Sequence, residues 1–130
     1  PNAYLPLNQP VKGKYIRYKN VEVPGQNLAL SEIRVFGKGL GKKPLKVKGF
    51  QVNRQEDRRD AAIKWEPVKG AQGYNIRWGI APDKLYHSWL IYDVNEHFMR
   101  NLDRGTEYYF SIEAFNENGI SDKTEVLEVK

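Results

Sequence analysis

The fold of this chain is decided by residues 102–119, LDRGTEYYFSIEAFNENG. Apolar side chains recur at every second position from Tyr108 to Ala114, with mostly polar residues between them. Side chains of a β-strand point alternately to opposite faces, so this period of two predicts a strand with one buried face. The stretch closes on Asn118-Gly119, a dipeptide that strongly favours a tight hairpin turn. Residues 102–119 therefore predict a strand and a hairpin of an all-β protein.

A tyrosine stands at the start of the predicted strand. Tyr108 follows a Gly-Thr turn, and a leucine precedes that turn at Leu102. This arrangement matches the tyrosine corner of Greek-key sandwiches, in which the tyrosine hydroxyl bonds to backbone across the corner. We expect Tyr108 and Trp65 to be buried, with the Tyr108 hydroxyl bonded to backbone at residues 102–105.

The composition is that of one globular domain rich in β-structure. The 130 residues are enough for one core, and 40% of them are hydrophobic. Eight tyrosines, five phenylalanines and three tryptophans favour strands. The absence of cysteine excludes a disulfide framework and a thiolate metal site. No apolar stretch is long enough to cross a membrane, so we expect no membrane span.

The start of the chain carries no targeting signal. It begins at Pro1 rather than at a methionine, and no signal peptide is visible. We therefore expect the chain to be a piece of a longer protein.

The net charge of +5 is unevenly distributed. Residues 1–44 hold eight basic and two acidic residues, whereas residues 45–130 hold thirteen basic and fourteen acidic ones. A basic segment of this kind can meet nucleic acid. No aromatic–basic interleaving or zinc-finger spacing accompanies it, so we interpret it as a solvated surface with a lysine-rich linker and expect no nucleic-acid partner.

The domain boundary is predicted at residues 38–44, where glycine and lysine alternate before a proline. This composition is typical of a flexible connector. Seven short apolar runs follow at regular spacing and predict a seven-stranded sandwich. They are Leu45–Val52, Ala61–Trp65, Gly73–Trp78, Tyr86–Tyr92, Glu96–Asn101, Thr106–Phe115 and Ser121–Val129.

Four spaced patterns agree with one family. They are Trp65 before Glu66-Pro67, Tyr74-x-Ile76-x-Trp78, Leu102-x-x-Gly105-Thr106-x-Tyr108 and Ala114-x-Asn116-x-x-Gly119. On these residues the segment 45–130 resembles a fibronectin type III domain. The resemblance implies an immunoglobulin-like sandwich in which Trp65, Tyr74 and Tyr108 are structural. The family often has a proline before the glycine at 105, which this chain lacks, and Arg104-Gly105-Thr106 is not an Arg-Gly-Asp adhesion triplet.

The first 37 residues resemble a different family. The runs Tyr15–Tyr18 and Asn27–Gly37 are similar to the last two strands of a discoidin-like (coagulation factor 5/8 type C) jelly roll. A whole domain of that kind is several times longer, so the resemblance implies a partial β hairpin. Period-two alternation in Tyr15–Lys19 and Leu30–Phe36 predicts two strands paired antiparallel.

The apolar residues of this hairpin need a surface to cover, because a lone two-stranded hairpin is marginal in water. We expect them to lie on the sandwich sheet that exposes Tyr109 and Phe115. A second copy of the chain is the alternative, which gives a homodimer through residues 1–43.

The order of the segments suggests a parent protein. A jelly-roll tail, a Gly/Lys linker and a fibronectin type III domain follow one another, together with the runs at 73–76, 82–86 and 113–119. These features are similar to the C-terminal ends of bacterial xylosidase/arabinosidase-type glycoside hydrolases, notably family 43. The resemblance implies a non-catalytic accessory module whose partner is the catalytic domain of the same parent chain. It also implies a periplasmic or extracellular bacterial location.

Catalytic residues are not expected in this segment. The acids fall on predicted turns and outward strand positions, without the apolar surroundings that raise the pKa of a general acid. His87 and His97 have no carboxylate at ligand spacing, and His97 is interpreted as a packed core imidazole. Ser88 is next to His87 in a predicted strand, so the two side chains point to opposite faces. We expect no catalytic residue, no metal and no cofactor.

Surface aromatics are the candidate functional residues. If alternate residues from Tyr108 onward point inward, Tyr109 and Phe115 point outward, and we expect Trp89 with Tyr86 or Tyr92 in the same neighbourhood. A planar aromatic patch can dock on a neighbouring domain or stack on a plant cell-wall glycan. Two alternatives to a spacer therefore stay open, a carbohydrate-binding module and a protein-interaction or adhesion domain.

Overall fold

The computed structural model describes residues 6–19, 21–22, 25, 33–37 and 39–130. The chain divides into two units, Pro1–Gly37 and Lys38–Lys130. The described residues of the first unit contain no strand: neither Tyr15–Lys19 nor residues 33–36 form the predicted hairpin, and its other residues lie outside the described ones. Ile16 and Phe36 are 66% and 76% exposed. A two-stranded hairpin is marginal in water by itself, and the absence of strands among these described residues is in keeping with that.

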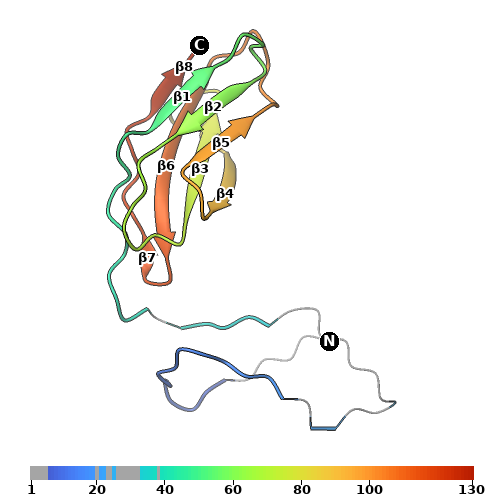
Figure 1. Ribbon diagram of the computed structural model, residues 1–130, viewed down its shortest axis with the longest axis vertical. Coiled ribbons are helices and arrows are strands. Elements are labelled where there is room, and N and C mark those ends of the chain that lie inside the picture. The colour runs from blue at the N-terminus through green and yellow to red at the C-terminus, as the bar shows by residue number, and fades with distance from the viewer. Residues whose placement is uncertain (1–5, 20, 23–24, 26–32, 38) are drawn as a thin grey trace. The chain divides into compact units, whose positions relative to one another are not determined.

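The second unit is a β-sandwich, and the predicted fold class is confirmed (Figure 1). One sheet has the strand order β1-β2-β5, and in the other β4, β3 and β6 are adjacent while β7 and β8 both pair with β6. The strands are β1 (Gln51–Arg54), β2 (Ala61–Lys64), β3 (Gly73–Gly79), β4 (His87–Tyr92), β5 (Glu96–Met99), β6 (Tyr108–Asn116), β7 (Gly119–Ile120) and β8 (Leu127–Val129).

The last predicted strand is divided in two. Between β7 and β8 the chain still runs beside β6, but two hydroxyl groups replace backbone carbonyls as acceptors. The amide of Ala114 donates to Ser121 Oγ at 2.9 Å, and the amide of Ile112 donates to Thr124 Oγ1 at 3.1 Å. These side-chain bonds compete with the regular ladder and interrupt the strand. The first predicted strand is shorter as well, since β1 begins only at Gln51.

The core lies between the two sheets, and alternate residues of the neighbouring strands β3 and β6 supply one side of it. Ile76 stands opposite Ile112 in the register, and both are fully buried. The Trp65 and Tyr74 rings meet edge to face at 5.1 Å, with 3% and 6% exposure. The Tyr74 hydroxyl accepts a hydrogen bond from the amide of Val68 at 2.8 Å, so the buried polar group is satisfied.

The tyrosine corner is formed. Tyr108 is buried, and its hydroxyl accepts a hydrogen bond from the amide of Asp103 at 3.1 Å. Arg54 completes the corner, because its guanidinium lies 5.6 Å from the centre of the Tyr108 ring. The same guanidinium donates to the carbonyls of Arg58, Asp103 and Thr106. One side chain from β1 thus joins the 55–60 turn to the loop that leads into β6.

Replacement of Tyr108 by phenylalanine is expected to lower the free energy of unfolding by about 1–3 kcal/mol, because the amide of Asp103 loses its buried acceptor. Urea denaturation of both proteins measures the difference. Tyr109→Phe is the matched control, since Tyr109 lies on the opposite face of the same strand. Equal losses of unfolding free energy in the two variants, or a loss below about 0.5 kcal/mol in Tyr108→Phe, would mean that the hydroxyl bond of the corner does not stabilise the domain.

Candidate functional site

The outer face of the five-stranded sheet carries two of the four candidate aromatics. Tyr109 and Phe115 are half-buried there, and each stands opposite a glycine of β3, Gly79 and Gly73 respectively. The Phe115 ring fills the place that a side chain at Gly73 would take: a Cβ there would lie 2.6 Å from Phe115 Cζ. This ring therefore has a structural task, which is to cover the sheet where β3 has no side chain.

Tyr92 is the aromatic neighbour of Phe115. The two ring centres are 5.6 Å apart and their planes meet at 84°. Perpendicular rings form a stable edge-to-face pair, but they do not present the common flat surface on which a sugar ring stacks. Tyr109 lies six residues from Phe115 along β6, about 20 Å at the rise of a strand. The outer face therefore offers separate rings rather than one platform.

Trp89 does not belong to this face, so the expectation that it joins Tyr109 and Phe115 is wrong. In the register of β3 with β4, Trp89 stands opposite the core residue Ile76. Its ring centre lies 4.6 Å from His97 and 6.3 Å from Trp78, at the open edge of the sandwich between β4 and β5. The register with β3 turns Trp89 to the core face, whereas Tyr92, the other β4 aromatic expected there, lies on the outer face beside Phe115.

Tyr86 precedes β4 and is 81% exposed. It lies outside the sheet register, so the four candidate aromatics do not form a single surface. Whether any of them contacts a glycan or a neighbouring domain stays a prediction.

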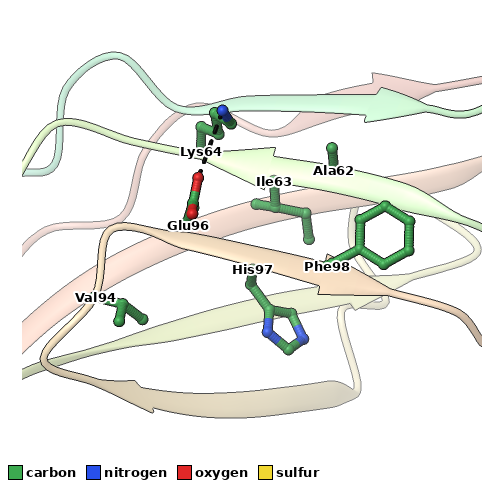
Figure 2. A pocket seen from close by; sticks show the side chains of 7 residues that line it. All are labelled: Ala62, Ile63, Lys64, Val94, Glu96, His97 and Phe98. Carbon is green, nitrogen blue, oxygen red and sulfur yellow. Dashed lines mark ion pairs between the residues drawn. The ribbon is translucent and has the colours of Figure 1, made fainter.

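A shallow pocket of about 410 Å³ lies on the sheet of β2 and β5 (Figure 2). Figure 2 shows the ion pair of Lys64 and Glu96 at one end and the Phe98 ring at the other, and the pair spans 3.5 Å. The charges of this pair offset each other, and the rest of the lining is apolar apart from His97. The residues that line it are Ala62, Ile63, Lys64, Val94, Glu96, His97 and Phe98.

His97 is half-buried rather than a fully packed core residue. Its Nε2 atom is buried without a hydrogen-bond partner. Burial lowers the pKa of His97, because the charged imidazolium would lose hydration. The unpartnered nitrogen and the Trp89 ring beside it make the imidazole a packing group that resists protonation.

The charged turn at residues 55–60 borders a second depression, of about 540 Å³. Arg59 binds the Asp57 carboxylate through Nη2 at 2.6 Å and Nε at 3.1 Å, and Arg104 lies 3.6 Å away. The hydrogen bonds from Arg59 hold the pKa of Asp57 well below its ordinary value. A carboxylate that stays ionised and paired cannot act as a general acid.

Glu113 is the only buried acid within residues 39–130. Its carboxylate accepts a hydrogen bond from the side-chain amide of Asn75 at 2.8 Å.

The described residues contain no group of three or more histidine, aspartate or glutamate side chains that could hold a metal ion. In the same part of the chain no helix is long and apolar enough to span a membrane.

The linker is the feature that the sequence interpretation missed. The sequence predicts a flexible connector over residues 38–44, yet the described part, residues 39–44, is bonded to the β6–β7 hairpin. The amide of Gly41 donates to Asn118 Oδ1 at 2.7 Å, and Asn116 Nδ2 donates to the carbonyl of Lys42 at 3.0 Å. Asn116 Nδ2 also reaches the carbonyl of Gly70 at 3.0 Å.

The linker glycines make this contact possible. A Cβ at Gly41 would lie 2.8 Å from Asn118 Nδ2, and one at Gly39 would collide with Asn118 and with the carbonyl of Glu117. Lys43 and Lys46 add ion pairs to Asp122 at 3.1 Å and Glu125 at 2.9 Å. We call residues 39–46 the strap. Two asparagines flanking the hairpin turn were the signal in the sequence, since asparagine amides bond readily to nearby backbone.

The sandwich fold and the formed tyrosine corner both fit one family. A sequence profile described as "Fibronectin type III domain" matches residues 45–130. The chain belongs to the fibronectin type III family. Domains of this family serve as spacers or interaction modules and are generally non-catalytic.

Solved fibronectin type III structures share the architecture. FN3tt is 26% identical, covers 69% of this chain and 98% of its own length, and has a TM-score of 0.57. A Fn3-like protein from Clostridium thermocellum is 16% identical over 68% of this chain and 91% of its own, with a TM-score of 0.58. The FN1–FN3 domains of chicken CNTN1 are 22% identical over 66% of this chain, with a TM-score of 0.59, and the match spans only 30% of that three-domain chain. The latter two likenesses show the fold alone. No curated protein sequence matches the chain.

The stability of the domain is expected to fall as the pH drops below 6.5, the ordinary pKa of histidine. The unfolded chain then takes up a proton that the folded protein, with the lowered pKa of His97, does not. Urea midpoints measured between about pH 7.5 and about pH 5.5 test this. His97→Phe should flatten the dependence, whereas His87→Phe, at an exposed position, should leave it in place. A slope that is identical in wild type and His97→Phe would contradict the assignment.

Proposed function

We propose that this chain is a non-catalytic spacer and support module, which carries the upstream part of its parent protein on a firmly held linker. The observation that carries the proposal is the strap. A flexible tether would leave residues 39–46 without contacts to the domain, but here two asparagine side chains and two ion pairs bind them to the hairpin and the segment that follows it.

The strap can fix the point at which the preceding chain leaves the sandwich. Pro44 is buried at its domain end, and upstream of it Lys43, Lys42 and Gly41 are each bound to the domain. Backbone between two such fixed points has little freedom to reorient. The preceding chain therefore leaves the sandwich at a fixed place beside the β6–β7 turn, as a spacer requires.

The parent is proposed to be a bacterial glycoside hydrolase of xylosidase/arabinosidase type, located in the periplasm or outside the cell. The support is the order of the segments and the sequence runs at 73–76, 82–86 and 113–119, which resemble the C-terminal ends of such enzymes. The partner is then the catalytic domain of the same chain. The gene sequence upstream of Pro1 tests this: a five-bladed propeller with three spaced acids is expected, and an unrelated upstream domain would remove the parentage while leaving the spacer role.

The 130-residue chain is expected not to hydrolyse aryl xylosides or arabinofuranosides above the rate in buffer. Its described acids are paired or solvated, and the two opposed carboxyls of a glycosidase need to stand within ~5–10 Å of one another. Chromogenic substrates provide the assay. Hydrolysis that is lost on replacing any single acid of the chain would contradict the accessory role.

Release of the strap is expected to expose it to trypsin. Gly41→Ala and Asn118→Ala should each raise the rate of cleavage after Lys42, because the first adds a clashing Cβ and the second removes the acceptor of the Gly41 amide. Lys43 itself precedes a proline and resists cleavage. Mass spectrometry of timed digests gives the rates.

Gly105→Ala is the control for the strap experiment, because no atom lies within 4 Å of a Cβ at that glycine. Cleavage after Lys42 that is equally fast in wild type, Gly41→Ala and Asn118→Ala would show that the strap is free in solution, and the spacer would then be a tether.

A further inference from the structure

The edges of the two sheets differ in how they are protected. Charged side chains on an edge strand discourage pairing with another chain. β1 carries Arg54, β5 carries Glu96 and β8 carries Glu128, while β7 is only two residues long. The remaining edge strand, β4, has no such protection.

The unprotected edge is a long uncharged run. Residues 85–92, LYHSWLIY, contain no lysine, arginine, acid, glycine or proline. Within residues 39–130, β4 pairs with β3 alone, so its other edge is unpaired. Leu90 and Tyr92 are 55% and 54% exposed on the outer face of this strand. A six-residue strand of high β-propensity without charge is a template for the addition of a further strand.

We propose that β4 pairs with β4 of a second copy of this chain, antiparallel and centred on Leu90, to form a two-fold symmetric dimer. An uncharged edge matches an uncharged partner, and among the strands of the described sandwich only β4 and the two-residue β7 carry no lysine, arginine or acid. An antiparallel contact uses the same edge on both copies, so it closes at two molecules.

The register centred on Leu90 also has complementary ends. Opposite residues of an antiparallel pair share a face, so Leu90 meets its own copy and Ser88 meets Tyr92. The next step outward sets His87 of one copy opposite Asp93 of the other. Both residues are exposed, and Asp93 ends the strand with φ 60°. Each end of the paired strands therefore places Asp93 of one copy opposite His87 of the other, which gives two such pairs in the dimer.

Sedimentation velocity of the full chain over a concentration series tests the dimer. A reversible monomer–dimer equilibrium is expected, and Leu90→Lys should abolish the dimer because two ammonium groups would face each other at the two-fold axis. The control Ile120→Lys places the same charge on β7, where Ile120 is 56% exposed, and should leave the dimer intact. Circular dichroism melts confirm that both variants are folded.

Cysteine cross-linking tests the register, since the natural chain has no cysteine to interfere. Under mild oxidation Leu90→Cys should link to itself, and Ser88→Cys should link to Tyr92→Cys in a mixture. Ile120→Cys should remain unlinked. Links between Ser88→Cys and Leu90→Cys in place of these would overturn the register.

Three results would overturn the pairing itself. They are a chain that stays monomeric at every concentration, a dimer that survives Leu90→Lys, and oligomers that grow beyond two. A dimer that survives Leu90→Lys but is lost on deletion of residues 1–37 would place the contact in the first unit instead.

Discussion

Strand β6 is the constraint on which the rest of the domain depends. It pairs with β3 on one side and with β7 and β8 on the other. Its even-numbered side chains, from Tyr108 to Ala114, supply the centre of the core, and its first residue forms the tyrosine corner. Its last residue, Asn116, binds the strap. A shift of one residue in its pairing would move every one of these groups to the opposite face.

The period-two pattern of this strand explains why the fold was predictable. Alternation over Tyr108–Ala114, the Asn118-Gly119 turn and the spaced apolar runs each predicted β-structure, and the sandwich is confirmed. The end of the chain was not predictable in the same way. Ser121 and Thr124 look like ordinary strand residues in the sequence, and only their bonds to the amides of β6 reveal that the strand is interrupted there.

The candidate surface was harder to predict because it depends on register between strands. Sequence alternation shows which residues of one strand share a face, and Tyr109 and Phe115 do lie on the same face of β6. It does not show how β4 is aligned with β3, and that alignment turns Trp89 inward beside His97. The strap was missed for a related reason: glycines and lysines in a row suggest freedom, and the asparagines that bind them lie 74 or more residues later in the chain.

The strap has a consequence for how this region can vary in length. Surface linkers ordinarily accept insertions at little energetic cost, since loop-closure entropy grows slowly with length. Here Gly39 and Gly41 must both fall against Asn118, and Lys43 must then reach Asp122. One added residue between Gly41 and Pro44 would shift both glycines out of place and set bulkier side chains against the hairpin. The spacing from Gly39 to Pro44 is therefore as fixed as that of a strand, although it has the composition of a loop.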